Sequence, residues 1–291
     1  MDLRRFFVNL HRSMALFTAS LNSGSNGNCY YIGNENEAIL VDAGISCRET
    51  ERRMARIGLS MQKVKALFIS HEHTDHIAGV RVLSKKYKLP VYITSDTLLH
   101  SRLPLDESLV RPFKAYEDIR IGNLAVVPFP KQHDASEPHS FIVRGGGVTV
   151  GVLTDIGEGC EHVIDNFRQC HAVYLETNYD EKMLMEGNYP HYLKKRISGS
   201  HGHLSNAQAL ELFTGHRPEF MTHVFLSHLS KDNNSPGLVQ DLFEQHAGPV
   251  EVVVASRYCE TPVFYISGSH RKKVVRQEVS KQVTASQISL F

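Results

Sequence analysis

The stretch that decides the fold is residues 68–76, Phe-Ile-Ser-His-Glu-His-Thr-Asp-His. It begins in a short apolar run that is typical of a buried strand. If the backbone stays extended after that strand, the imidazoles of His71 and His73 point to the same face and can bind one cation. Asp75 and His76 follow, and the turn that leads into the next helix can swing them towards a second cation beside the first.

Imidazoles combined with one carboxylate form a ligand set that suits zinc, and also iron or manganese. The alternative is a polar loop that carries surface histidines. Four ligands at this spacing, directly after a buried strand, rarely coincide, and this favours a metal site.

The His-x-His-x-Asp-His signature resembles that of the metallo-β-lactamase superfamily. The resemblance implies an α/β fold of four layers, the αββα metallo-β-lactamase sandwich, with the metal site along one edge between two sheets. It also implies that Asp42, which follows an expected strand, supports the site from behind and is not itself a ligand.

The same resemblance implies further ligands after later strands. Asp155 ends a buried strand, where a carboxylate is costly unless it is paired or metal-bound. Its place matches the bridging aspartate of the family. His133 supplies the third imidazole of the first metal, with His139 as a weaker competitor. The implied ligands are His71, His73 and His133 on one ion, Asp75, His76 and His228 on the other, and Asp155 between them.

The composition limits the classes of protein and the cellular compartments to which this chain can belong. The 291 residues carry a formal net charge of +1, so no overall basic field draws the chain to nucleic acid. Five scattered cysteines without a Cys-x-x-Cys pair argue against a disulfide framework and for a reducing compartment. No apolar run reaches membrane-spanning length, and residues 1–12 lack the apolar region of a signal peptide. These features predict a cytoplasmic protein without a membrane partner.

The chain divides into a metallo-β-lactamase-fold domain over residues 14–268 and a polar, basic tail over residues 269–291. Strands are expected at residues 16–21, 29–32, 38–41, 64–69, 91–94, 124–129, 148–153, 172–175, 224–226, 250–255 and 263–266. Helices are expected near residues 46–57, 95–102, 162–169, 189–197 and 238–245, together with one that starts at Gly79 and one that Ser205 caps. Ser46 and Glu49 predict a capping box at the start of the first. Residues 103–122 predict only loop and edge structure. The small residues of 22–28 suit either an ordinary hairpin turn or a loop that faces the substrate.

Two divalent ions held a few ångströms apart lower the pKa of a bridging water and neutralise charge on a reacting group. The ligand set therefore predicts metal-dependent hydrolysis, without choosing between an ester, a thioester, a lactam and a phosphodiester. Asp75 is a catalytic candidate because its loss would remove the second ion and abolish turnover.

Three downstream segments look like those of the tRNase Z nucleases: Glu176-Thr177-Asn178, Gly202-His203-Leu204-Ser205 and His228-Leu229-Ser230. By that resemblance His203 protonates the leaving 3′ oxygen and Glu176 orients His203. The alternative is that His203 only starts a helix and that Glu176 is a surface carboxylate.

A closer resemblance is to the YycJ/WalJ-like branch of the superfamily, described as 5′-to-3′ exonucleases on DNA. It rests on the signature and on residues 23–28, 42–44, 133–135, 154–155, 202–206 and 228–234. The chain departs from that branch at Tyr179, where a histidine is expected, and at His139, where the residue is usually apolar. The domain that larger nucleases insert before the last histidine is absent, so nucleic acid must be gripped by the core, the tail or a second subunit.

The resemblance implies a dinuclear metal-dependent phosphodiesterase, a DNA exonuclease of repair or replication. The main alternative is a small-molecule metallohydrolase of the same fold, such as a thioesterase, a lactonase or a cyclic phosphodiesterase. A redox diiron protein normally has a glutamate at the position of His73 and an attached flavin domain. A non-catalytic scaffold normally lacks some of the ligands, which are all present here.

The last five residues, Gln-Ile-Ser-Leu-Phe, end a stretch with few apolar residues. The pattern looks like the peptide by which bacterial replication and repair proteins bind the DNA sliding clamp. That resemblance implies contacts from Gln287, Leu290 and Phe291, while the basic run 270–273 would lie near phosphates. The alternative is an apolar end without a binding role, or a strand that adds to a sheet edge.

Overall fold

The structure is a computed structural model, and it describes residues 15–268. The expected tail and its terminal clamp-binding pattern lie outside the described residues, so the division of the chain at residue 268 stays a prediction. Within the described part, no helix combines the length and the apolar character that crossing a bilayer requires.

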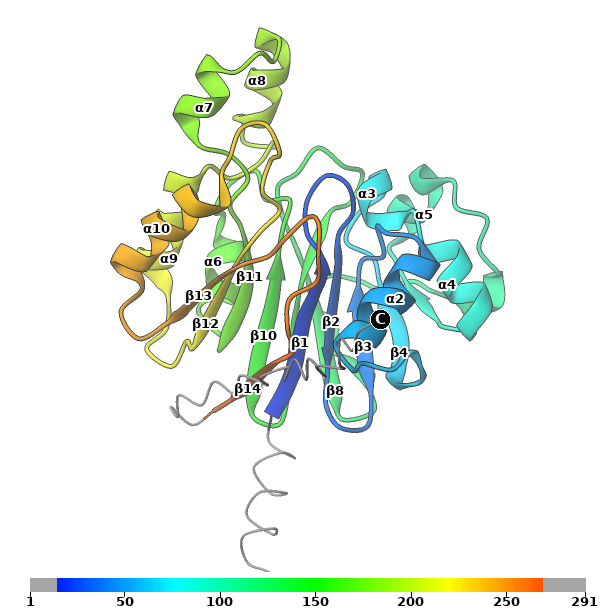
Figure 1. The fold of residues 1–291 in the computed structure, drawn as a ribbon. Coiled ribbons are helices and arrows are strands. Elements are labelled where there is room, and N and C mark those ends of the chain that lie inside the picture. Colours follow the sequence, from blue (N-terminus) through cyan, green and yellow to red (C-terminus); the bar gives the residue numbers. More distant parts are fainter. Residues whose placement is uncertain (1–14, 269–291) are drawn as a thin grey trace, which may run out of the picture.

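Two sheets of seven strands each pack face to face (Figure 1). The first has the order β14-β1-β2-β3-β4-β5-β6 and the second the order β13-β12-β11-β10-β9-β8-β7. The strands of the first sheet are β1 (Ala15–Asn22), β2 (Cys29–Gly33), β3 (Ala38–Val41), β4 (Val64–Phe68), β5 (Val91–Tyr92), β6 (Val110–Arg111) and β14 (Phe264–Ser267). The strands of the second sheet are β7 (Ile119–Ile121), β8 (Leu124–Pro130), β9 (His139–Gly145), β10 (Val148–Leu153), β11 (Ala172–Glu176), β12 (His223–Ser227) and β13 (Glu251–Val254).

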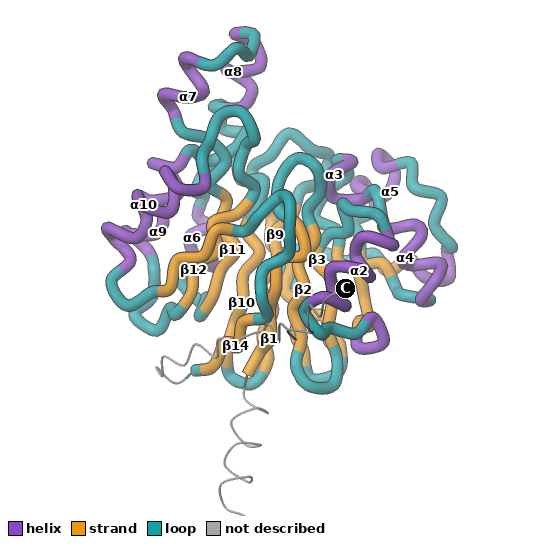
Figure 2. The backbone as a smooth tube through the Cα atoms, viewed as in Figure 1, coloured by secondary structure: helices purple, strands orange, loops and turns teal. Residues whose placement is uncertain are grey.

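Helices cover the outer face of each sheet (Figure 2). Beside the first sheet lie α2 (Cys47–Arg56), α3 (Thr74–Ile77), α4 (Val80–Tyr87) and α5 (Ser95–Ser101). Beside the second lie α6 (Glu161–Phe167), α9 (Asn206–His216) and α10 (Pro236–Ala247). Two further helices, α7 (Glu181–Glu186) and α8 (His191–Ile197), stand clear of both sheets (Figure 1). The layers are therefore helix, sheet, sheet and helix, which confirms the αββα sandwich.

The central strands β3, β10 and β11 are buried along their whole length, and they are mostly apolar because both of their faces are covered. One face packs in the core between the sheets, where the rings of Tyr30 and Tyr174 lie 4.8 Å apart. The other face packs against helices. In the second sheet β10, β11, β12 and β13 run parallel, so their carboxyl ends lie at one edge.

Most expected elements are present within a few residues of their predicted bounds, but two were missed. Strand β9 carries polar residues at His139, Ser140 and Arg144, which obscure its apolar pattern. Helix α7 is short and buries only Leu184, so it leaves no helical periodicity in the sequence. Residues 103–122 contain a short 3-10 helix, η2 (Glu107–Leu109), and the edge strands β6 and β7, in line with the prediction of loop and edge structure.

Helix caps follow the predicted residues in part. Ser205 and Gln208 form a complete capping box at the start of α9. Ser46 accepts a hydrogen bond from the backbone of Glu49, as expected. The carboxylate of Glu49 does not return the bond to Ser46 but pairs with Arg52 and Arg53, so the predicted box is only half formed.

Candidate metal centre

The candidate ligands lie at the edge where strands of both sheets end. His71 follows β4 of the first sheet, whereas Asp155 and His228 follow β10 and β12 of the second. The carboxyl ends of parallel strands are where α/β proteins place their ligands, because the loops there converge. Segments far apart in the sequence are thereby brought to one site.

The turn that carries Asp75 is held by a close backbone contact. A Cβ atom at Gly44 would lie 1.6 Å from the carbonyl oxygen of Asp75, so a glycine is required there. The backbone N–H of Asn28 donates to that same carbonyl oxygen at 2.7 Å. The Asn28 side chain donates to Oδ2 of Asp75 at 3.2 Å, so the small-residue loop after β1 supports the site directly.

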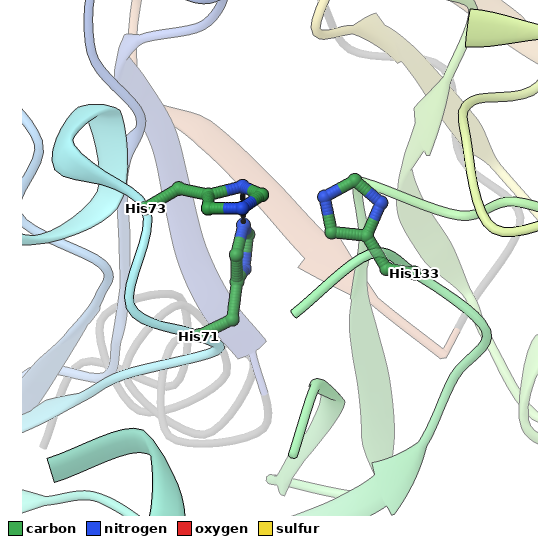
Figure 3. Close-up of side chains that lie close together, drawn as sticks. All are labelled: His71, His73 and His133. Carbon is green, nitrogen blue, oxygen red and sulfur yellow. Dashed lines mark hydrogen bonds between the residues drawn. The ribbon is translucent and has the colours of Figure 1, made fainter. Parts of the chain in front are cut away.

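Three imidazoles form the first group. His71 and His73 come from the loop after β4, and His133 comes from the loop after β8 and faces them from the other side (Figure 3). Nε2 of His71 lies 3.1 Å from Nδ1 of His73. One nitrogen from each ring lies within 4.8 Å of the other two, which is close enough for the three to share a metal ion.

A second group, with donor atoms that also lie within 4.8 Å of one another, consists of Asp75, His76 and His228. Asp155 lies between the groups. Its Oδ2 is 3.1 Å from Nε2 of His76, while its Oδ1 is 3.8 Å from Nε2 of His133. The structure thus brings every predicted ligand into one continuous cluster, with Asp155 in the position expected of a bridge.

Outer partners fix which ring nitrogen faces the cluster. Asp42, fully buried after β3, accepts from Nδ1 of His76 at 2.8 Å and from both N–H and Oγ of Ser70. Ser70 Oγ in turn accepts from Nδ1 of His71, and Gly202 O accepts from Nδ1 of His133. With Nδ1 occupied, Nε2 of each ring is left to bind a metal, as second-shell contacts commonly arrange.

Two histidine ring nitrogens at the centre show that the cluster fits a cation. Nε2 of His133 and Nε2 of His228 are buried and make no hydrogen bond to any described residue. An unpaired buried polar atom is costly, and a bound divalent ion would remove the cost at both positions. The donor set of imidazoles and carboxylates is thus suited to divalent metal binding.

Glu176 lies at the centre of a hydrogen-bond network that joins His203 to the second ligand group through His228. Its Oε1 accepts from Nδ1 of His203 at 2.9 Å and from Nδ1 of His228 at 2.8 Å. Its Oε2 accepts backbone N–H groups of Ile156 and Leu204. Burial would raise the pKa of Glu176, but the charge on His203 and the hydrogen bonds from the two histidines outweigh burial and lower it to about 2. The alternative of a surface carboxylate is therefore wrong, since Glu176 is fully buried.

A cavity of about 380 Å³ opens onto the cluster. It is lined by Ser25, His73, Thr74, Asp75, Asp134, Asp155, Arg196, Ile197, Gly202, His203 and His228. Because Ser25 lines it, the loop after β1 faces the cavity and is more than a hairpin turn. The side chain of His203 is 21% exposed, so a molecule in the cavity can reach it.

Neither departure from the YycJ/WalJ-like branch reaches this cavity. Tyr179 is buried and pairs through its backbone with Ser205. His139 is buried with its ring against Phe113, so it does not replace His133 in the cluster. The sequence did not reveal Ser70, Asp134 or Arg196 as site residues, because serine, aspartate and arginine are frequent in loops and carry no ligand spacing of their own.

The comparisons with known proteins agree with this geometry. A model of the beta-lactamase superfamily domain matches residues 37–228, which spans the cluster from Asp42 to His228. Exodeoxyribonuclease YycJ of Bacillus anthracis is 33% identical over 232 residues, 78% of this chain and 87% of that protein. Exodeoxyribonuclease WalJ of Streptococcus pneumoniae is 32% identical over 222 residues, 74% of this chain and 81% of that protein.

Solved structures share the fold at low identity. YhfI of Bacillus subtilis, a metallo-beta-lactamase fold protein, superposes with a TM-score of 0.67 at 14% identity, covering 86% of this chain and 99% of its own. The short form of human tRNase Z superposes with a TM-score of 0.57 at 16% identity, covering 84% and 98%. Because the family match and the YycJ relative each extend over most of the described chain, the chain belongs to the β-lactamase superfamily, as a metal-dependent hydrolase of that fold.

Proposed function

We propose that this chain is a dinuclear metal-dependent phosphodiesterase that removes nucleotides from DNA ends. The observation that carries the proposal is the buried Glu176, which holds His203 at the cavity wall beside both ligand groups. An alkoxide is a poor leaving group from a phosphodiester, so a positioned proton donor is useful in this reaction. The relatives named exodeoxyribonucleases support DNA as the substrate.

The ligand groups divide between two ions. His71, His73 and His133 would hold one, Asp75, His76 and His228 the other, and Asp155 would contact both. When bound, divalent ions supply Lewis-acid polarisation of a phosphoryl oxygen and lower the pKa of a water molecule. The many imidazoles suit zinc best, with manganese or iron as alternatives.

The side chains of the cavity then move protons. Asp75, at the cavity wall, accepts the proton of the attacking water through its carboxylate. The water oxygen bonds to phosphorus while the bond from phosphorus to the 3′ oxygen breaks. His203 gives that oxygen a proton from Nε2, since its Nδ1 is held by Glu176. The terminal nucleotide leaves with a free 3′ hydroxyl, and the remaining strand keeps a 5′ phosphate.

The direction of attack follows the family resemblance, 5′-to-3′. Single-stranded DNA labelled at its 5′ end should release a labelled mononucleotide at once, whereas the same strand labelled at its 3′ end should shorten as a ladder. The opposite pair of patterns would contradict this polarity.

The experiment that tests the proposed function is a substrate panel given to the metal-loaded protein. It should contain end-labelled single- and double-stranded DNA, RNA, a thioester, a lactone and a cyclic nucleotide. Turnover of DNA well above all the others supports the exonuclease. Turnover of a small ester alone would replace it by the small-molecule hydrolase, for which Glu176 and His203 have no evident role.

The cellular setting is proposed on the same grounds. The scattered cysteines, without a Cys-x-x-Cys pair, favour the cytoplasm. Gln287, Leu290 and Phe291 form the pattern that would bind the sliding clamp, and binding there would bring the enzyme to DNA in repair or replication.

A further inference from the structure

Helices α7 and α8 form an arm, residues 180–200, that projects beyond the two sheets (Figure 1). Its base is firmly attached. The backbone N–H of Asp180 donates to the carbonyl of Asn233 at 2.8 Å, and Tyr189 donates from its hydroxyl to Asp232 at 2.9 Å. Lys194 of α8 donates to the carbonyl of Met185 of α7 at 2.6 Å, which joins the helices to each other.

Helix α8 leads directly into the site. Its last residues, Arg196 and Ile197, line the cavity. The backbone N–H of His203 donates to the carbonyl of Ile197 at 2.8 Å, so the end of α8 and the proposed proton donor are fixed to one another. A substrate that extends out of the cavity on this side would therefore pass along α8.

One stripe of α8 is exposed to solvent. Lys195 and Arg196 lie three and four residues after Tyr192, so both flank Tyr192 on the same side of the helix. Tyr192 is 74% exposed, an unusual position for a large aromatic side chain. Lys195 makes no ion pair or hydrogen bond to a described residue, and α8 contains no acidic residue. The stripe thus combines an aromatic ring with two cations and leads to the cavity.

The guanidinium of Arg196 is already oriented for binding an anion. Its Nε and one terminal nitrogen both lie 2.5 Å from Oδ2 of Asp134, which orients the guanidinium at the cavity rim. The remaining N–H donors of the group are left for a ligand, and its side chain is 60% exposed. Among the described residues that line the cavity, Arg196 is the single arginine or lysine. It is therefore the group that would offset repulsion between a phosphate and the surrounding carboxylates.

We infer that the α8 stripe is the strand-binding surface of this enzyme: Arg196 binds a phosphate next to the reacting one, Lys195 binds a phosphate farther out, and Tyr192 stacks on a base. The inference rests on the proposed nuclease function and names the part of the substrate that lies outside the cavity. The ligand is single-stranded nucleic acid, because a base must be unpaired and unstacked to lie on the tyrosine ring. A duplex would offer its phosphates but not a base face.

A protein partner suits this surface less well. A docking surface for a protein normally has a contiguous apolar centre, whereas the stripe holds one aromatic ring between cations. Alternating phosphates and bases match cations and a ring, and stacking tolerates any base sequence. These two features suit an enzyme that must follow a strand without choosing its sequence.

The test measures binding by fluorescence anisotropy, using the full-length metal-loaded protein. The probe is labelled single-stranded DNA with phosphorothioate linkages, which resist hydrolysis. Tyr192→Ala should weaken binding by about fivefold to a hundredfold, the range that loss of one stacked base gives. Lys195→Ala and Arg196→Ala should each reduce the dependence of log Kd on log salt by about one phosphate contact.

An abasic series separates stacking from a general loss of affinity. Removing single bases in turn near the strand end should weaken wild-type binding at one position, and Tyr192→Ala should be insensitive to the same removal. Matched controls are Tyr265→Ala, an exposed tyrosine on β14 at the other end of β1, and Lys85→Ala on α4. Both should bind like the wild type.

The possible results distinguish the strand-binding inference from the proposed nuclease function. If the wild type hydrolyses and binds DNA but the three stripe variants match the controls, the inference is wrong and the nuclease stands. If Tyr192→Ala loses affinity equally with and without the base, the ring does not stack. If the wild-type protein neither binds nor hydrolyses nucleic acid, the proposed function itself is wrong.

Discussion

Nδ1 of His203 lies 2.9 Å from Oε1 of Glu176, and the carboxylate is fully buried whereas the imidazole reaches the cavity. Glu176 is therefore the fixed, buried member of the pair, and His203 is the member that a molecule in the cavity can contact. Glu176 accepts from Nδ1, so that under the proposed function Nε2 would be the nitrogen that exchanges a proton with a substrate. This geometry suits the proposed role of His203 as a general acid, and the alternative is a histidine that only starts a helix.

His203→Ala should lower the turnover of DNA by roughly a hundredfold or more, the usual contribution of a general acid. Nitrophenyl phosphodiesters should be affected much less, because nitrophenolate leaves without protonation. The measurement is kcat on both substrates, together with the metal content. His201→Ala is the matched control, since His201 is exposed two residues away and does not line the cavity. Equal losses on both substrates would assign His203 a structural role.

The protein as purified should contain about two divalent ions per chain, as dinuclear hydrolases do. Asp75→Ala should reduce this to about one and abolish turnover, because Asp75 belongs to only one of the two ligand groups. Elemental analysis checks both values. His100→Ala, which changes an exposed histidine of α5 outside every ligand group, should retain the wild-type content. Full activity in a metal-free sample would refute the dinuclear mechanism.

Removing the metal should also lower thermal stability, independently of activity. The unpaired nitrogens of His133 and His228 would then stay buried without a partner. An ion present at a hundred times its Kd stabilises the folded state by roughly 2.7 kcal/mol, which corresponds to a Tm several degrees higher for a chain of this size. Scanning calorimetry with and without a chelator should show this difference in the wild type and in His203→Ala. A Tm unaffected by the chelator would mean that the cluster holds no ion.

Much of this site could be predicted from the sequence, for a physical reason. His71, His73, Asp75 and His76 are adjacent in the chain, so their spacing alone shows that they can converge. His133, Asp155 and His228 are isolated, and only the order of parallel strands brings them to the same edge. Their assignment came from the family resemblance and not from their local sequence.

The outer contacts were harder to foresee. Arg196 reaches Asp134 across 62 residues of chain, and such a pair leaves no local pattern. Helix α7 was missed because it buries a single side chain, and without it the arm could not be recognised. A periodic pattern of apolar residues predicts the helices and strands that pack in the core. A projecting helix buries few side chains, so its sequence lacks that pattern.

Stability should depend on pH through Glu49, away from the metal centre. Hydrogen bonds from Arg52 and Arg53 lower the pKa of Glu49 to about 2. A lowered folded pKa stabilises the protein above the unfolded value of about 4.5, and this stabilisation is lost as the pH falls towards 2. Glu49→Gln should therefore cost roughly 0.5–1 kcal/mol near pH 7 and progressively less below pH 4.5.

Urea midpoints of the wild type and Glu49→Gln, compared between pH 7 and pH 3, measure this dependence. Glu35→Gln is the control, because Glu35 is exposed and makes no ion pair with a described residue. A difference between wild type and Glu49→Gln that stays constant with pH would show that the carboxylate charge is not the cause.

The terminal pentapeptide provides the last prediction. A synthetic peptide ending in residues 287–291 should bind the sliding clamp of the same organism in roughly the micromolar range, since a few anchoring side chains retain modest affinity after the cost of ordering. Calorimetry or anisotropy measures this binding. Replacing Leu290 and Phe291 by alanine in the full chain should abolish clamp binding and leave hydrolysis of free oligonucleotides unchanged, because these residues lie outside the predicted domain of residues 14–268. On DNA loaded with the clamp, the wild type should act faster than this variant, because tethering raises the local concentration of ends. If the wild-type peptide does not bind at high micromolar clamp, the tether is wrong, and the assignment to repair or replication then rests only on the relatives named exodeoxyribonucleases.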